Sequence, residues 1–256
     1  QCLSSIVRQT KTPYEVLISD DGSDDDSLQI IKSFAEKFEG TTTKVFRNSK
    51  LGIAENCNFL VNNASGNFIK FVFQDDCLDE SCLETFCNYL IKHNNVEFAF
   101  SRRGVLLENP SNKLCIDIYN GCKDLHTHWS SLKEIQNGLA LLEDPKIFTS
   151  PINKIGEPSN TLIKRNLFLE LGGFDEKFVQ LIDIDFWLRI LSKTKVLFVN
   201  QELSSFRVHE KQKSVENLEN GSFLKDFIFL YEKIILDDYY FIKSSKLKKS
   251  AIKQLL

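Results

Sequence analysis

Two adjacent carboxylates follow an apolar stretch in the first third of the chain. Asp75 and Asp76 follow residues 68–73, which read FIKFVF, after the single residue Gln74. Neighbouring negative charges repel each other, and a divalent cation that takes them as oxygen ligands removes that repulsion. The pair is therefore a candidate cation site, and a cation held there would bind a phosphate group. For an Asp-Asp pair taken alone, a turn or a helix cap is the more frequent role.

A second acidic turn lies earlier in the chain. Residues 14–23 read YEVLISDDGS, so an apolar run ends in Asp20, Asp21 and Ser23. If this run and residues 68–73 are strands of one parallel sheet, their carboxyl ends meet at the same edge. Ligands bind in the crevice at that edge. We therefore expect the two acidic segments to face one site.

The elements that would position these residues alternate between strand and helix. Apolar spacing predicts helices at 2–10, 26–38, 52–64 and 81–93, and short apolar runs predict strands at 14–19, 43–48, 68–73 and 96–101. Strands joined by helices of this length imply right-handed crossovers. The sequence thus predicts an α/β, Rossmann-like fold with a mainly parallel sheet and helices on both faces.

Composition narrows the class of protein. The chain has 256 residues, of which 42% are hydrophobic and 26% charged, and these values are typical of a soluble domain. A net charge of -3 argues against nucleic acid as a partner. The seven cysteines form no CxxC pair, which favours reduced thiols and a cytoplasmic location. We find no apolar run of about 18 residues and no signal peptide.

Five segments occur in a fixed order over about residues 3–214: LSSIVRQTKTPYEVLISDDGSDDDS, LGIAENCNFLVNNASGNFIKFVFQDD, LGGFDE, DIDFWLRI and FRVH. Together they resemble the family 2 glycosyltransferases of the GT-A fold. The first segment is similar to that family's first helix and nucleotide-binding turn. LGIAENCNFLVNNASGNFIKFVFQDD resembles the segment that leads to its DxD metal motif. LGGFDE, then DIDFWLRI, then FRVH resemble its acceptor-side segment, its catalytic-base helix and its closing motif.

The resemblance implies a role for each matching position. Asp183 would be the catalytic base, and Arg207 would neutralise the leaving diphosphate. The remaining roles would be nucleotide binding by Asp20, Asp21 and Ser23, and binding of Mn²⁺ or Mg²⁺ by Asp75, Asp76 and His209.

A second acid, Asp185, lies two residues after the expected base. Residues two apart on a helix point about 200 degrees from each other, so only one of the pair can face the crevice. We assign the base to Asp183. Taken singly, both are also ordinary first-turn residues, which the helix dipole favours.

The chain departs from the family pattern at three positions: Phe73, where relatives often have an acid, Ile182 before the base, and Glu55, where a basic residue is frequent. The sequence contains no methionine and opens on a helical pattern. We therefore expect it to be a fragment that lacks the family's first strand.

The resemblance implies an inverting, metal-dependent glycosyltransferase. Its donor would be a nucleotide sugar, with UDP favoured, and its acceptor a glycan or lipid-linked hydroxyl in surface polysaccharide synthesis. Two alternatives stay open. One is a sugar nucleotidyltransferase. The other is a non-catalytic glycan-binding or scaffold protein derived from a transferase, which Phe73 and Ile182 keep open.

The pattern divides the chain into a glycosyltransferase domain at 1–215 and a C-terminal helical extension at 216–256. The extension is rich in aromatic and branched apolar residues and is basic from Lys243 to Lys253. Such a segment can contact an anionic membrane surface, at the inner face of the plasma membrane. The alternative, which we favour, is an amphipathic helical pair that packs on the domain.

Overall fold

The computed structural model describes residues 1–38, 40–108, 111–236 and 244–255. The strands are β1 (Glu15–Asp20), β2 (Thr42–Arg47), β3 (Phe68–Ile69), β4 (Cys77–Leu78), β5 (Phe98–Leu107), β6 (Ile135–Asn137), β7 (Thr161–Lys164) and β8 (Lys195–Val208). The helices are α1 (Cys2–Val7), α2 (Ser27–Ala35), α3 (Ile53–Asn63), α4 (Cys82–Lys92), α5 (Lys113–Gly121), η1 (Leu125–His128), α6 (Gly138–Leu142), η2 (Pro158–Asn160), α7 (Arg165–Glu170), α8 (Ile182–Leu191), α9 (Lys213–Glu219), α10 (Ser222–Leu236) and α11 (Ser245–Leu255).

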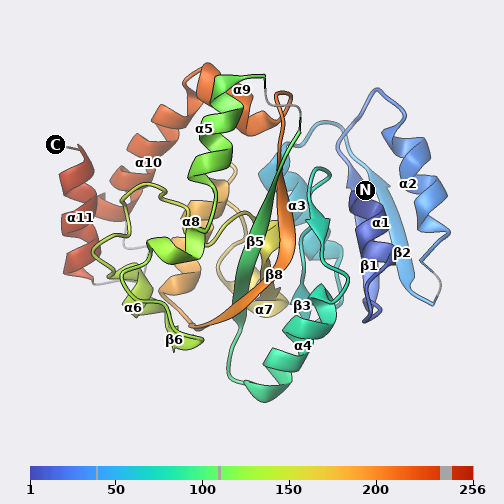
Figure 1. Ribbon diagram of the computed structural model, residues 1–256, viewed down its shortest axis with the longest axis horizontal. Helices are drawn as coiled ribbons and strands as arrows, with labels where there is room; N and C mark the ends of the chain where they lie inside the picture. The colour runs from blue at the N-terminus through green and yellow to red at the C-terminus, as the bar shows by residue number, and fades with distance from the viewer. Residues whose placement is uncertain (39, 109–110, 237–243, 256) are drawn as a thin grey trace.

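The strands form two sheets, and the predicted α/β fold is confirmed. β1 and β2 pair in parallel over six residue pairs. A six-stranded sheet has the order β3-β7-β5-β8-β4, with β6 also on β8. Its long central pair, β5 and β8, is parallel over ten residue pairs, whereas each antiparallel pairing holds two or three. The β1–β2 sheet and α2 lie at one end of the molecule, and α10 and α11 lie at the other (Figure 1).

The prediction of a strand at 68–73 is wrong beyond Ile69, where β3 ends. β3 pairs antiparallel with β7, and continuing that register would place Phe73 opposite Ser159. The chain at Ser159 is a short 3₁₀ helix that begins at Pro158, so no strand lies there. The Ser159 hydroxyl instead accepts the Phe73 N–H, at 3.1 Å. Residues 70–76 therefore cross the end of the sheet as an irregular segment.

The main core lies between the six-stranded sheet and the helices that follow β7. Phe98 on β5 contacts Trp187 on α8, and Phe186 contacts Phe168 and Phe174 with ring centroids 4.8 and 4.9 Å apart. Aromatic pairs at these separations add to the free energy gained by burying the rings. This packing fixes the position of α8 under the end of the sheet.

The C-terminal helices pack on the same core. Leu230 and Ile234 of α10 and Leu247 and Ala251 of α11 are all buried in it. Residues 237–243 of the predicted extension, with Lys243, lie outside the described residues. Within the described part of the chain, no helix combines the length and the apolar character that crossing a bilayer requires.

Gly138, the first residue of α6, lies against the loop that follows α8. A Cβ atom at this position would be 2.2 Å from Leu191 O and 2.7 Å from Thr194 O, and both are backbone atoms. We expect Gly138→Ala to lower the free energy of unfolding by about 3 kcal/mol, because the two segments would have to separate. Urea unfolding measures the change.

Gly121, the last residue of α5, provides the matched control. A Cβ atom there would meet nothing within 4 Å. Gly121→Ala should leave stability unchanged or raise it by up to about 1 kcal/mol, since alanine is the better helix former. Equal unfolding midpoints for the two variants would contradict the close packing at Gly138.

Candidate active site

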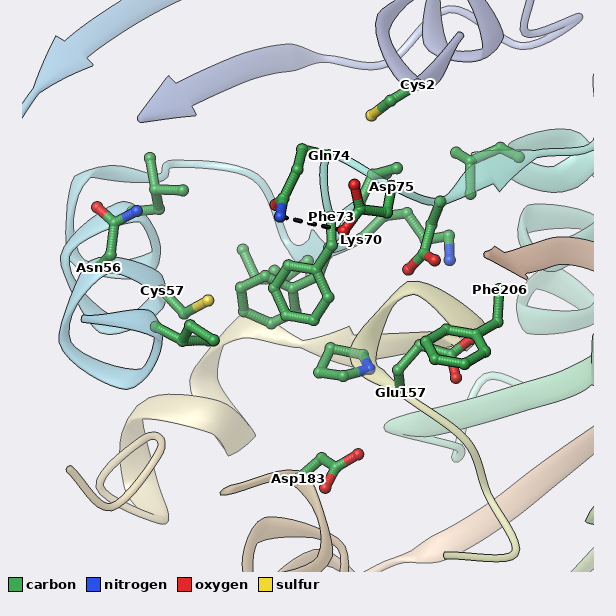
Figure 2. A pocket seen from close by; sticks show the side chains of 18 of the residues that line it. Cys2, Asn56, Cys57, Lys70, Phe73, Gln74, Asp75, Glu157, Asp183 and Phe206 are labelled. Atoms are coloured by element: carbon green, nitrogen blue, oxygen red, sulfur yellow. Dashed lines mark hydrogen bonds between the residues drawn. The ribbon is translucent and has the colours of Figure 1, made fainter. Parts of the chain in front are cut away.

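All predicted site residues except His209 lie around one cavity of about 1920 Å³. It is bounded by the end of β1, by segment 70–76, by the start of α8 and by β8. Figure 2 shows Asp75 on one side of this space and Asp183 on the other. The predicted site residues that line the cavity are Asp20, Asp21, Ser23, Asp75, Asp76, Asp183 and Arg207. His209 does not line it.

Asp75 contacts both residues that the closing motif contributes. His209 Nε2 lies 3.3 Å from Asp75 Oδ2. Arg207 Nε donates a hydrogen bond to the Asp75 carbonyl at 2.9 Å, and Arg207 Nη1 pairs with Glu108 at 2.6 Å. Arg207 therefore connects the end of β8 to the irregular segment and holds Asp75 at the cavity.

Asp76 is more deeply buried, with 2% of its surface exposed. Its carboxylate accepts hydrogen bonds from the Ser159 hydroxyl and the Arg207 backbone N–H. Burial, followed by the charge of Glu157, raises the pKa of Asp76 to about 7. In the part of the chain that the structure describes, its Oδ2 atom is buried without a hydrogen-bond partner.

These residues fit a divalent cation that arrives with its substrate. The side chains of Asp75 and His209 are in contact, and Asp76 Oδ2 is a hydrogen-bond acceptor without a partner among the described residues. Among the described residues, no three metal-ligating side chains form a closed cluster. Mg²⁺ is commonly bound by one or two carboxylates together with substrate phosphates, and such a site needs no closed protein cage.

The acidic turn after β1 is held by its own hydrogen bonds. Asp20 Oδ1 accepts the Ser23 N–H at 3.2 Å, and Arg47 Nε lies 3.6 Å from Asp20 Oδ2. The two oxygens of Asp21 accept the N–H groups of Leu51 and Gly52, at 2.7 and 2.8 Å. Asp21 thus joins this turn to the start of α3 and forms one wall of the cavity.

Asp183 lies in the first turn of α8, at the opposite side of the cavity. Its Oδ1 accepts the Ile184 N–H at 2.8 Å, and Asn153 Nδ2 donates to its Oδ2 at 2.7 Å. Burial raises the pKa of Asp183 to about 7, and the charge of Glu157 makes a smaller contribution in the same direction. A carboxylate with such a pKa can accept a proton near neutral pH.

Asp185 points the other way, into the protein. It is fully buried and pairs with Arg189 at 2.6 Å and with Lys233 of α10 at 2.8 Å. Its carboxylate is therefore part of the packing between α8 and α10, and Asp183 is the acid of the two that reaches the cavity.

Three polar residues of the cavity were missed by the sequence reasoning. Lys70 donates to the Ser159 carbonyl, and burial lowers its pKa. Asn153 orients Asp183, and Glu157 forms an ion pair with Arg103 at 3.1 Å. No local sequence pattern identifies these three residues as site residues. A single lysine within an apolar run and a glutamate before a proline are both common in proteins without a functional role.

The geometry suits a group-transfer reaction. One side of the cavity offers carboxylate ligands for a cation with its bound phosphate, and the His209 imidazole lies against one of these carboxylates. The other side offers a carboxylate that can take a proton from an attacking hydroxyl. A substrate that spans the cavity would place its reacting carbon between the two.

Comparison with known proteins identifies the family. The family model described as Glycosyl transferase family 2 matches residues 1–168. The chain belongs to glycosyl transferase family 2. The match includes the turn after β1 and the Asp75-Asp76 pair. It ends before α8.

This family 2 protein has a curated relative in Mycobacterium tuberculosis, an uncharacterized protein that is 31% identical to it over 205 residues. The alignment covers 80% of this chain and 61% of that protein, so the chain spans about three fifths of the relative's length.

Two solved glycosyltransferases share the fold. TarS 1-349 of S. aureus in complex with UDP-GlcNAc has a TM-score of 0.71 at 16% identity, covering 99% of this chain and 66% of that one. The mannosyltransferase PcManGT of Pyrobaculum calidifontis, in complex with GDP-Man and Mn²⁺, has a TM-score of 0.61 at 15% identity, covering 99% and 68%. The shared fold includes α8 and β8, which lie beyond the family match.

Proposed function

We propose that the protein is an inverting, metal-dependent glycosyltransferase that moves a sugar from a nucleotide-sugar donor to an acceptor hydroxyl. The observation that carries the proposal is one cavity lined by the turn at Asp20–Ser23, by Asp75 and by Asp183, with His209 in contact with Asp75. The complexes of the two solved glycosyltransferases, with UDP-GlcNAc and with GDP-Man and Mn²⁺, support a nucleotide-sugar donor. We favour UDP as its nucleotide.

Each group has a part in the transfer. The turn after β1 binds the nucleoside, and Asp75, with His209 and Asp76, would hold Mn²⁺ or Mg²⁺. The cation would supply positive charge to the departing diphosphate. Asp183 takes the proton of the acceptor hydroxyl as its oxygen bonds to the anomeric carbon, and the bond from that carbon to the diphosphate oxygen breaks. Attack from the face opposite the leaving group inverts the anomeric centre.

The acceptor in this proposal is a glycan or lipid-linked hydroxyl in surface polysaccharide synthesis. The protein would work in the cytoplasm, with membrane contact through the described lysines of α11. These are Lys246, Lys248, Lys249 and Lys253.

A donor panel tests the proposal. We expect the naturally occurring protein to be stabilised by one nucleoside diphosphate among UDP, GDP and TDP when Mn²⁺ is present. At a hundredfold excess over the dissociation constant the gain is about 2.7 kcal/mol, and EDTA should abolish it. The sugar nucleotide with the same base should release that diphosphate slowly by hydrolysis. Absence of both stabilisation and hydrolysis across the panel would favour a non-catalytic protein.

A further inference from the structure

The buried ion pair between Arg103 and Glu157 has no role in the proposed binding of the nucleotide and cation or in the proposed proton transfer. Its side chains are 5% and 13% exposed, and Arg103 Nε lies 3.1 Å from Glu157 Oε2. The Arg103 guanidinium also stacks on Phe206, 4.8 Å from the ring centroid. Figure 2 shows Glu157 and Phe206 next to each other on one side of the cavity.

The backbone around Glu157 is held from several sides. Trp187 Nε1 donates to the Gly156 carbonyl at 2.9 Å, and Asn160 Nδ2 donates to the carbonyls of Ile155 and Ser101, both at 2.7 Å. Gly156 has a φ of +102°, and a Cβ there would be 3.1 Å from Arg103 Nε. Only glycine allows this approach without strain. Glu157 is thus fixed in place before any ligand binds.

Arg103 reaches the pair from an irregular point of the central sheet. The register between β5 and β8 shifts on both sides of Arg102. Such bulges redirect side chains and are frequent beside active sites. Here the irregularity brings Arg103 to the cavity, next to Glu157, and both residues line it.

The pair leaves hydrogen-bonding capacity unused. Within the described residues, Glu157 Oε1 and Arg103 Nη1 are buried without a hydrogen-bond partner. Leaving a buried charged group unsatisfied is costly, so such groups usually meet a ligand, a water or an ion. Rotation about the last torsion of Glu157 exchanges its two oxygens at low cost. Either one can therefore be presented to a bound molecule.

The location of Glu157 indicates which part of a substrate it would meet. It lines the same cavity as Asp76, near the expected diphosphate, and Asp183, the expected base. In a transfer with inversion, the sugar ring lies between the leaving diphosphate and the attacking hydroxyl. Glu157 is near both ends of that path, so a bound sugar would lie beside it.

We propose that the Glu157 carboxylate, positioned by Arg103, accepts a hydrogen bond from a hydroxyl group of the transferred sugar. This inference rests on the proposed glycosyltransferase function and adds a residue that selects the donor sugar. A buried carboxylate accepts strongly from a hydroxyl and is left unpaired by a sugar without it. The pair would thus discriminate between sugars that differ at that one position.

Calorimetric titration of the naturally occurring protein with Mn²⁺ tests this role. The probes are UDP, GDP, UDP-glucose, UDP-galactose, UDP-GlcNAc and GDP-mannose, with single-deoxy analogues of the sugar nucleotide that binds. We expect Glu157→Gln to bind that sugar nucleotide about 10- to 100-fold more weakly and to bind the nucleoside diphosphate unchanged. One deoxy analogue should bind the wild type and the variant equally, because the interaction is absent in both.

Two further variants separate this role from a structural one. Glu157→Asp keeps the charge opposite Arg103 but shortens the side chain, so it should fold and still lose sugar affinity. Glu202→Gln removes the exposed carboxylate that pairs with the neighbouring Arg102 at 2.9 Å, and should change neither affinity. A structural role for Glu157 would weaken diphosphate and sugar nucleotide equally.

The outcomes distinguish the two proposals. If the wild type binds a sugar nucleotide and both Glu157 variants bind it equally well, the role of Glu157 is overturned and the proposed function stands. If the wild type binds neither diphosphates nor sugar nucleotides, the proposed function fails, and the sugar contact fails with it.

Discussion

Asp183→Asn should reduce turnover by about 10³-fold and leave the affinity for nucleoside diphosphate unchanged. The proposed base lies at the cavity, where Ile184 N–H and Asn153 Nδ2 orient its carboxylate. Asparagine can keep the hydrogen bond from Ile184, but it cannot take a proton from the acceptor hydroxyl. General-base catalysis contributes about 10² to 10⁴ in rate. Steady-state kinetics with the donor found in the panel would measure the loss, and a variant with normal turnover would rule out this base.

The pH dependence gives the same assignment an independent check. Because burial raises the pKa of Asp183 to about 7, the base is protonated below neutral pH. We expect kcat/KM of the wild type to fall about tenfold per pH unit below pH 7, and the residual activity of Asp183→Asn to lack that dependence. A wild-type profile that stays flat down to pH 5 would contradict the assignment.

Stability separates Asp183 from its neighbour. The folded protein keeps a proton on Asp183 between about pH 4 and pH 7, where the unfolded chain has lost it, so this group contributes stability that decreases as pH rises. Above pH 7, Asp183→Asn should therefore unfold no more easily than the wild type. Asp185→Asn breaks buried pairs with Arg189 and Lys233 and should cost about 3 to 5 kcal/mol, with little change in kcat of the folded fraction.

Asp75→Asn should abolish the metal dependence of nucleotide binding. Asp75 is the more exposed acid of its pair, with 33% of its side chain accessible, and its carboxylate lies against His209. Removing the charge should lower affinity for the diphosphate in Mn²⁺ by about 100-fold or more, to the value measured in EDTA, since even outer partners of metal ligands contribute 10- to 100-fold. Calorimetric titration with and without EDTA measures both values.

The choice of variant follows from burial. Replacing Asp76 would also remove hydrogen bonds to the Ser159 hydroxyl and the Arg207 N–H, so a loss of binding could come from a disturbed fold. Glu80→Gln is the matched control, because Glu80 is exposed and pairs only with Arg8 among the described ion pairs. If Asp75→Asn retains Mn²⁺-dependent binding, the cation is held elsewhere.

Much of the fold was predictable from local patterns. The expected strand at 14–19 is β1 at Glu15–Asp20, and the expected helices at 52–64 and 81–93 are α3 and α4 within two residues at each end. These segments carry their signal in the spacing of apolar residues, which depends only on neighbours in the chain. The two acidic segments do line one cavity, but the expected reason was wrong, because β1 and β3 lie in different sheets and β3 pairs antiparallel with β7.

The sequence alone was sufficient to predict the α/β class, the family and the two acidic segments, because each of these depends on residues that are close together in the chain. Contacts between distant segments decided the rest. Ser159 accepts the N–H of Phe73, Lys233 and Arg189 hold Asp185 in the core, and Trp187 and Asn160 hold Glu157 beside Arg103. Burial and charge at such positions depend on residues up to 86 positions away in the chain, so no local pattern reports them.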